Sequence, residues 1–349
     1  MTAGASPRIM VTGVGGAPGF DLAAGLLRRG IDVIGLDADP LAPGLLIPGI
    51  IARVAASSAD PDFPASLLGL CRELRPAALF STVEVELPAL IRLQHDLAGL
   101  GVRTWLPDAH GVQACIDKAA FHRVLTRRGL PVPRTWLPGE ISEVPDSVPL
   151  VVKPRGGQGA KNVHFCSARH QARVLCELVP DPVIQEQVTG REFTADCLTD
   201  REGRASVILR WRLLVKGGLS VVSATFHDED TARLVKNVLT AIGATGPCCV
   251  QGIIGDDGSR PRVQFLEANA RFAGAFRASE AAGADLVGQA LNGMLGIPVD
   301  HARLAYQPGI YLTKYTETLW SGPWPAARQP TASAAAALAG GEGASPWTA

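Results

Sequence analysis

The chain has 349 residues, of which 47% are hydrophobic and 19% charged, a balance typical of a globular protein with a large core and not of a disordered chain. The length allows two or three packed domains at roughly 100–200 residues each. Because 33 Lys and Arg residues balance 33 Asp and Glu residues, no overall positive field favours nucleic acid or an anionic membrane as a partner.

The seven cysteines form no Cys-x-x-Cys pair, and most lie in apolar segments, as structural thiols do. The adjacent Cys248 and Cys249 are predicted to face opposite ways on a strand, which argues against a shared metal or redox site. The N-terminus lacks the pattern of a signal peptide, and no apolar run reaches bilayer length. We therefore expect a cytoplasmic, reducing location without membrane contact.

The first 112 residues alternate strands and helices, which predicts a parallel doubly wound sheet. A strand at 8–12 leads into a glycine-rich turn at 13–19, a helix at 20–29 and a second strand at 32–37. Further elements are predicted as a helix near 64–74, a strand at 77–80, a helix near 86–99 and a strand near 102.

The first domain is expected to end near residue 112. A helix is expected at 117–128, and proline-marked loops follow as far as 149. Beyond them the sequence predicts an α+β domain with an antiparallel sheet. Its strands are expected at 150–153, 162–165, 183–187, 192–198, 206–214, 220–225, 248–254 and 261–267, with helices near 229–242 and across 279–295. The tail at 321–349 is rich in Ala, Pro, Gly and Ser and is predicted to be disordered.

The turn at 13–19 is similar to a dinucleotide fingerprint, and Asp37 would be the acidic residue after the second strand. Pro18 lies where a helix N-terminus should offer free N–H groups, which weakens an anion site. Two alternatives stay open: a nicotinamide cofactor bound at this turn, or a turn that serves only tight helix–strand packing.

A glycine-rich segment follows the apolar strand that delivers Lys153. No Gly-Lys-Ser/Thr opens a helix, so the segment is no strand–loop–helix phosphate loop. It is predicted as a hairpin whose tip, with Gly156, Gly157 and Gly159, folds over a polyphosphate. An ordinary exposed hairpin is the alternative.

Two strands are predicted to meet at 189–190, with Glu186 and Glu192 on either side and the Val188 backbone between them. A strand-edge carbonyl and N–H can pair with an adenine ring, and a carboxylate accepts hydrogen bonds from ribose hydroxyls. A polar hairpin without a ligand is equally compatible with this segment.

The last motif is the pentad Glu267-Ala-Asn269-Ala-Arg271 behind an apolar strand. Alternation on a strand points its carboxylate, amide and guanidinium to one face. Hard oxygen ligands suit magnesium bound with phosphates, and arginine suits phosphate oxygens. Strand pairing would place Gln251 beside Glu267 as a further ligand. The alternative is a surface pair between Arg271 and Glu267.

In this order the motifs resemble the ATP-grasp superfamily, with the carbamoyl-phosphate-synthase-like and amino-acid ligase branches most similar, over the chain to about residue 315. The resemblance implies a pre-ATP-grasp domain at 1–112, a small ATP-grasp subdomain at 113–190 and a large subdomain with the metal site at 191–320. It implies ATP and two Mg²⁺ ions, which Mn²⁺ can replace.

The resemblance also implies roles for particular residues. Catalysis would use Arg271, Lys153 and Lys118, the last in an Asp-Lys pair that opens a helix. The nucleotide would bind Lys118, Lys153, Gly156, Gly157, Gly159, Glu186, Val188, Glu192 and Lys216. The metal ligands would be Gln251, Glu267 and Asn269. Substrate candidates are Arg277, which could grip a carboxylate, together with Ser279 and Glu84.

The implied reaction is ATP-dependent ligation of a small carboxylic acid or amino acid to an amine or thiol, through an acyl phosphate, with release of ADP and phosphate. The partners would be small molecules and not nucleic acid or membrane, and a homodimer is compatible with the resemblance. The alternatives are phosphorylation of a carboxylate or carbamate without an amine acceptor, a nicotinamide-dependent oxidoreductase, and a nucleotide-binding module without catalysis.

Overall fold

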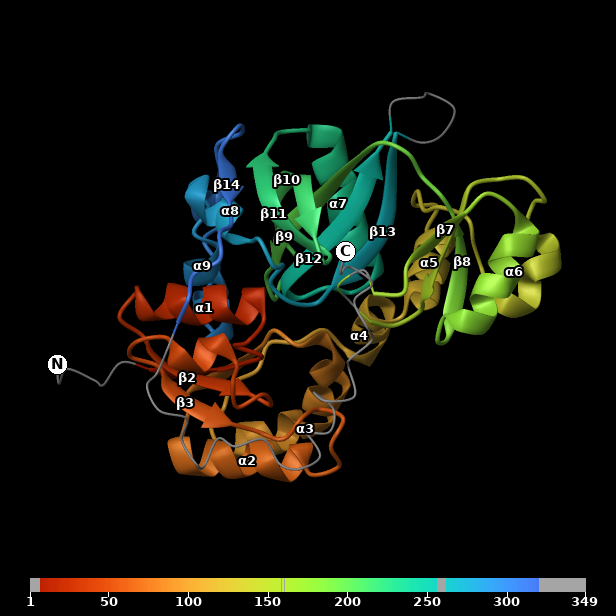
Figure 1. The fold of residues 1–349 in the computed structure, drawn as a ribbon. Coiled ribbons are helices and arrows are strands. Elements are labelled where there is room, and N and C mark those ends of the chain that lie inside the picture. The colour runs from red at the N-terminus through yellow and green to blue at the C-terminus, as the bar shows by residue number, and fades with distance from the viewer. Residues whose placement is uncertain (1–6, 158, 160, 256–261, 320–349) are drawn as a thin grey trace, which may run out of the picture.

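A computed structural model describes residues 7–157, 159, 161–255 and 262–319. The described chain forms three β-sheets, of four, six and four strands, with helices around them (Figure 1). The tail predicted at 321–349 and the turn predicted at 256–258 lie outside these residues. No helix in the described ranges is both long and apolar enough to cross a bilayer.

The N-terminal sheet is parallel and has the strand order β3-β2-β1-β4. Its strands are β1 (Arg8–Thr12), β2 (Asp32–Asp37), β3 (Ile51–Val54) and β4 (Ala78–Ser81). Helices α1 (Ala17–Leu27), α2 (Phe63–Leu74) and α3 (Leu87–Gly99) connect and cover it. The doubly wound sheet is confirmed.

Three details of this sheet differ from the sequence prediction. Strand β3 was not predicted, because its half-exposed run Ile51–Val54 is short and contains Arg53. The strand expected near residue 102 is only a bridge between Ala78 and Arg103. Helix α1 begins at Ala17 and includes Pro18 in its first turn, where proline costs no hydrogen bond.

The small sheet is antiparallel, with the order β5-β8-β6-β7. Its strands are β5 (Thr135–Trp136), β6 (Leu150–Pro154), β7 (His164–Cys166) and β8 (Pro182–Glu186), and α6 (Arg169–Leu178) packs on them. Helices α4 (Ala109–Ile116) and α5 (Lys118–Arg127) precede the sheet. Helix α4 crosses residue 112, where the sequence placed a domain boundary, and the domain limits stay a proposal.

The large sheet is antiparallel, with the order β13-β12-β9-β10-β11-β14. Its strands are β9 (Arg191–Thr199), β10 (Ala205–Lys216), β11 (Leu219–Thr225), β12 (Gly246–Ile254), β13 (Val263–Asn269) and β14 (Tyr311–Thr313). Helices α7 (Glu229–Ala241), α8 (Arg277–Ala281) and α9 (Leu286–Met294) accompany it. Both antiparallel sheets were predicted, so the fold class is confirmed.

One hydrophobic core joins the N-terminal unit to the large sheet. Leu22 of α1 and Val287 of α9 belong to the same buried cluster as Leu198 and Ile208 of the large sheet, and α1 lies against α9 (Figure 1). Packed interiors resist sliding. The shared core therefore fixes the carboxyl ends of the parallel strands relative to the large sheet.

Candidate active site

A large cavity of about 1130 Å³ lies where the three sheets meet. Pockets for one small molecule usually measure about 300–1000 Å³, so this cavity has room for more than one ligand. Most of the residues predicted to bind nucleotide or metal line it: Lys118, Lys153, Gly156, Gly157, Gly159, Glu186, Val188, Glu192, Gln251, Glu267 and Arg271.

Lys118 joins two of the predicted motifs. It is the first residue of α5, which Asp117 caps by accepting a hydrogen bond from the Ala119 N–H at 2.8 Å. The Lys118 ammonium donates to the Gly157 carbonyl at 3.2 Å and lies 3.7 Å from Oε2 of Glu267. A single cation therefore bridges the glycine-rich hairpin and the carboxylate of the pentad.

Lys153 is buried at the end of β6, where its ammonium donates to Oε1 of Gln185 at 2.8 Å. Burial lowers the pKa of Lys153 to about 8, a shift that nearby Lys118 increases and that Glu267 opposes. An anionic phosphate beside this ammonium would favour its charged form. A bound phosphate would therefore stabilise the protonated form of Lys153.

The glycine-rich segment connects β6 and β7, which pair antiparallel as predicted, although β7 starts at His164 and not at residue 162. Gly157 and Gly159 have φ angles of +94° and +77°, a region that side chains with a Cβ rarely adopt. The hairpin therefore needs glycine at these two positions to bend along the cavity. Residues 158 and 160 lie outside the described ranges.

The segment around Val188 differs from its predicted form. Strand β8 belongs to the small sheet and β9 to the large sheet, so the chain crosses between sheets and forms no hairpin there. In the described part of the chain no hydrogen bond involves the Val188 backbone. Val188 lines the cavity.

Glu186 and Glu192 flank this crossing, and each is near an arginine. Glu186 Oε2 lies 3.5 Å from Arg134 Nε, and Glu192 Oε2 accepts from Arg212 Nε at 3.0 Å. Both carboxylates border the cavity. Lys216, at the end of β10, is exposed and is not part of the lining, although the next two glycines are.

The pentad takes the predicted arrangement. Gln251 on β12 pairs directly with Glu267 on β13. Asn269 Nδ2 donates to Glu267 Oε1 at 3.4 Å, while Arg271 Nη2 donates to Asn269 Oδ1 at 3.0 Å. Carboxylate, amide and guanidinium are therefore in contact at one end of one hairpin, and Arg271 contacts Asn269, not Glu267.

The charge state of Glu267 follows from its neighbours. Burial alone would raise its pKa, but the ammonium groups of Lys118 and Lys153, the Asn269 hydrogen bond and the Arg271 guanidinium together lower the pKa below its ordinary value. Glu267 is thus an anion at neutral pH. It is a hard oxygen donor that faces a cavity rich in cations.

The donor set fits a magnesium ion that is bound partly by phosphate. Gln251 and Glu267 line the cavity on adjacent strands and offer an amide oxygen and a carboxylate, whereas the predicted ligand Asn269 is outside the lining and its Oδ1 accepts from Arg271. Among the described residues no group of three His, Cys, Asp or Glu side chains could hold a metal by itself. Mg²⁺ usually takes one or two carboxylates and completes its shell with substrate phosphates and water, which matches this set.

Glu84 lies behind the pentad and outside the cavity lining. Its Oε1 accepts from the Ala270 N–H at 3.3 Å. Burial raises the pKa of Glu84 to about 7, an effect that Arg271 opposes and Glu267 reinforces. Glu84 therefore contacts the pentad from the N-terminal unit, which is a different position from the predicted contact with substrate.

Two further substrate candidates are not brought to the cavity. Arg277 is exposed on α8, and the Glu280 carboxylate pairs with Arg29 instead of Arg277. Ser279 is fully buried, and its hydroxyl donates to Asp196 Oδ2 at 2.6 Å. Their predicted role in substrate binding gains no support from the structure.

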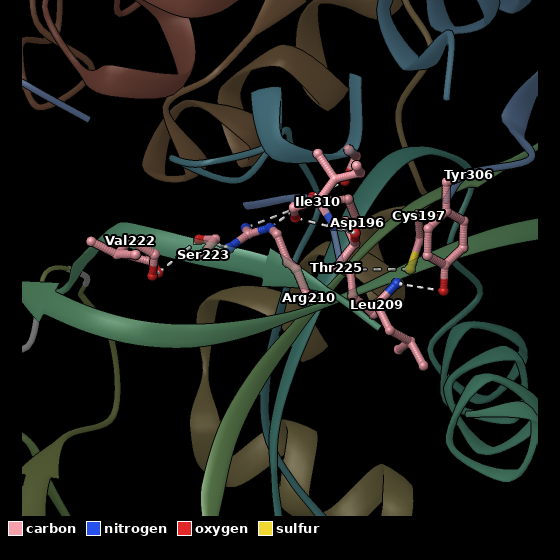
Figure 2. A network of polar contacts seen from close by, with 12 residues as sticks. Asp196, Cys197, Leu209, Arg210, Val222, Ser223, Thr225, Tyr306 and Ile310 are labelled. Carbon is pink, nitrogen blue, oxygen red and sulfur yellow. Dashed lines mark hydrogen bonds and ion pairs between the residues drawn. The ribbon is translucent and has the colours of Figure 1, made fainter. Parts of the chain in front are cut away.

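Arg210 and Asp196 form a buried ion pair within a network of polar contacts (Figure 2). Arg210 on β10, which lines the cavity, donates through Nε and Nη2 to both oxygens of Asp196 on β9, at 2.8 and 3.2 Å. Its Nη1 lies 3.3 Å from the Ser223 hydroxyl. This pair cannot be recognised in the sequence, because the two residues are brought together only by the register of β9 and β10.

The Asp37 carboxylate, at the end of β2, accepts a hydrogen bond from the glycine turn at 13–19. Asp37 accepts the Gly15 N–H at 2.7 Å and the Asp39 N–H at 3.0 Å. A Cβ on Gly19 would lie 2.1 Å from the Gly13 carbonyl oxygen, so glycine is required for packing. Asp37 and part of this turn, including Gly13 and Gly16, also line the cavity.

All seven cysteines are free thiols. Cys248 belongs to the hydrophobic core, whereas Cys249 lines the cavity. Their predicted opposite orientations are confirmed.

Comparisons with known proteins agree with this geometry. Residues 179–318 match the model of a family described as ATP-grasp in the biosynthetic pathway with Ter operon. No curated protein sequence matches the chain.

Solved structures of similar fold cover most of the chain. A biotin carboxylase–ATP complex from Campylobacter jejuni has a TM-score of 0.68 at 13% identity, covering 84% of this chain and 72% of that chain. An L-amino acid ligase from Bacillus licheniformis has a TM-score of 0.66 at 18% identity, with coverages of 87% and 78%. An N5-carboxyaminoimidazole synthase from Aspergillus clavatus, bound to ADP and 5-aminoimidazole ribonucleotide, has a TM-score of 0.67 at 16% identity, with coverages of 86% and 80%.

The chain has the ATP-grasp fold, and its resemblance to the ATP-grasp superfamily is confirmed.

Proposed function

We propose that this protein is an ATP-dependent ligase that joins a small carboxylic acid or amino acid to an amine or thiol. ATP would phosphorylate the carboxylate, and the nucleophile would displace phosphate from the acyl phosphate, with release of ADP and phosphate. The observation that carries the proposal is the convergence of Lys118, Lys153, Glu267 and Arg271 on one cavity.

The nucleotide would lie between the small and large sheets. The free Val188 backbone groups suit the adenine edge, and the neighbouring Glu186 and Glu192 carboxylates suit the ribose hydroxyls. The hairpin glycines and Lys153 would then cover the phosphates. In this placement the nucleotide would contact the predicted residues of the small sheet and its loops that line the cavity.

Phosphoryl transfer needs positioning and charge neutralisation more than a protein nucleophile. Gln251, Glu267 and Asn269 would hold Mg²⁺, which would neutralise phosphate charge when it is bound. Arg271 is fixed by its hydrogen bonds to Asn269 Oδ1 and to the Phe272 carbonyl. Its guanidinium is therefore preorganised for the transferred phosphoryl group. The presence of two ions and a homodimer stay predictions.

Glu267→Gln tests the metal assignment. The variant removes the single carboxylate of the donor set and is expected to lower ATP turnover by about tenfold or more, with a higher Mg²⁺ requirement, because an amide attracts the cation less strongly. ADP release across a Mg²⁺ titration measures both effects. Glu177→Gln on the exposed side of α6 is the control and is expected to behave as wild type. Normal turnover and normal Mg²⁺ dependence in folded Glu267→Gln would refute the assignment.

Lys153→Ala tests the hairpin. We expect the KM for ATP to rise roughly ten- to hundredfold, since a hydrogen bond to a charged group is worth about 1.5–3 kcal/mol. Circular dichroism should show an intact fold. The matched control is Lys236→Ala, an exposed lysine of α7. If both variants have the same nucleotide kinetics as wild type, Lys153 does not contact phosphate.

The substrates themselves are open to a direct screen. Panels of carboxylic acids and amino acids would be tested for ADP release with and without amines and thiols, and products identified by mass. Phosphate release that never depends on an acceptor would favour the alternative of a carboxylate- or carbamate-phosphorylating enzyme.

A further inference from the structure

The cavity extends beyond the nucleotide region into the N-terminal unit. There it is lined by the carboxyl ends of β1, β2 and β4 and by the start of α2. Ligands of open α/β sheets bind in the crevice outside these strand ends. This end of the cavity is not used by the residues assigned above to ATP and metal.

The charge of the lining differs sharply between the two ends. Among the described lining residues before position 113, the charged side chains are Asp37 and Glu86, and none is a lysine or arginine. The remaining lining carries the cationic side chains Lys118, Lys153, Lys161, Arg210, Arg212 and Arg271, which outnumber the carboxylates Glu186, Glu192 and Glu267. One end therefore suits a cationic group, and the other end suits phosphates and carboxylates.

Two hydroxyl groups hold the Glu86 carboxylate at the cavity wall. It is only 8% exposed, and its Oε2 accepts from the Thr12 hydroxyl at 2.5 Å and from the Ser81 hydroxyl at 2.9 Å. Within the described residues Oε1 has no hydrogen-bond partner. The two hydroxyls thus fix the carboxylate at the cavity wall and leave Oε1 available to a ligand.

Burial is the main reason why the pKa of Glu86 is raised to about 7, and the Asp37 carboxylate adds to the shift while the two hydroxyls oppose it. Asp37 and Glu86 line the same cavity. A cation bound between these two acids would favour ionised Glu86.

The rest of this end is apolar. Leu36, Phe63 and Leu67 line it, together with Ala55 and Ala56. Phe63 and Leu67 belong to the hydrophobic core and are fixed by packing. A ligand here would bury apolar surface next to the carboxylates, so its preferred chemistry is a positive charge on an apolar body.

We propose that this acidic and apolar end of the cavity binds the acceptor substrate, and that the acceptor is a primary amine with an apolar substituent. The inference rests on the proposed ligase function and specifies its second substrate. ATP and the carboxylate are anionic and belong to the basic end, so the amine is the reactant that the acidic end suits. Amines that carry a further negative charge are disfavoured by Asp37 and Glu86.

Calorimetry on the full chain tests the binding step. We expect phenethylamine to bind, and phenethyl alcohol, which lacks the charge, and taurine, which adds an anion, to bind at least tenfold more weakly. Glu86→Gln should reduce phenethylamine affinity at least tenfold, while the control Glu177→Gln should not change it. The inference is overturned if wild type binds the alcohol as well as the amine, or if folded Glu86→Gln binds the amine as tightly as wild type. The comparison of alcohol and amine on wild type needs no variant and decides the matter even if Glu86→Gln fails to fold.

Two further measurements separate this inference from the proposed function. Titration of ATP with Mg²⁺ into the same protein tests the ligase proposal alone. If ATP does not bind, the ligase proposal is wrong, while the amine titration still shows whether the acidic end binds an amine. Mass analysis of reactions with the carboxylate panel should find phenethylamine in an amide product. An amine that binds but never enters a product, while another nucleophile does, would overturn its role as acceptor.

Discussion

Arg271→Ala is expected to lower kcat for ATP turnover by about a thousandfold or more. An arginine at a transferring phosphoryl group contributes roughly 10³–10⁵ to turnover in related chemistry. In this protein the guanidinium is held by Asn269 Oδ1 at 3.0 Å and by the Phe272 carbonyl at 3.0 Å, so it is in place before the substrate arrives. Steady-state ADP release, with saturating ATP and the best carboxylate from the screen, measures the loss.

Two comparisons make this result specific. Arg233→Ala removes an exposed arginine of α7 that pairs with Asp230 and is expected to keep wild-type turnover. Arg271→Lys keeps one positive charge but cannot form the paired contacts of a guanidinium, and it should recover only part of the rate. If Arg271→Ala retains more than about a tenth of the wild-type kcat, the residue does not stabilise the transferred group.

The parts of the site that the sequence predicted are those determined by local rules. Alternation along β13 places Glu267 and Asn269 on one face, and the hairpin of β12 and β13 pairs Gln251 with Glu267. The positive φ of Gly157 and Gly159 likewise reflects a bend that only these residues tolerate easily. Period and turn chemistry act over a few residues, so a single sequence reveals them.

The features that the sequence did not reveal depend on contacts between distant segments. Glu84 was chosen as a substrate residue, yet it contacts Ala270, 186 positions later. Glu86 lines the cavity instead. Both residues belong to one 3₁₀ turn, Glu84–Glu86, in which three residues complete a turn and residues two apart point in different directions. Only the packing of the N-terminal unit on the large sheet decides which side faces the cavity.

The crossing near Val188 shows the same limit. A short polar segment between two strands is read most simply as a hairpin, because sequential strands commonly pair. Here β8 and β9 enter different sheets. A Cβ on Gly190 would lie 2.3 Å from the Ile254 carbonyl oxygen. The glycine therefore permits a close approach to β12, and in the sequence this glycine indicates only a turn.

Asp196→Ala is expected to cause the largest loss of stability in this chain, about 3–5 kcal/mol in the free energy of unfolding. The change leaves Arg210, which is 1% exposed, without the carboxylate that accepts two of its N–H groups. It also removes the acceptor of the Ser279 hydroxyl. An uncompensated buried charge is among the costliest defects in a folded protein. Urea denaturation followed by circular dichroism measures the shift.

The exposed pair of α7 provides the matched control. Asp230→Ala removes a carboxylate that also accepts from an arginine, at 2.7 Å, but solvent screens that pair and the loss should stay below about 1 kcal/mol. The double change Asp196→Leu with Arg210→Met should regain part of the stability, because buried ion pairs can be replaced by apolar residues of similar size. Equal urea midpoints for Asp196→Ala and wild type would contradict this prediction. They would mean that Arg210 forms hydrogen bonds to water or to another acceptor through the cavity that it lines.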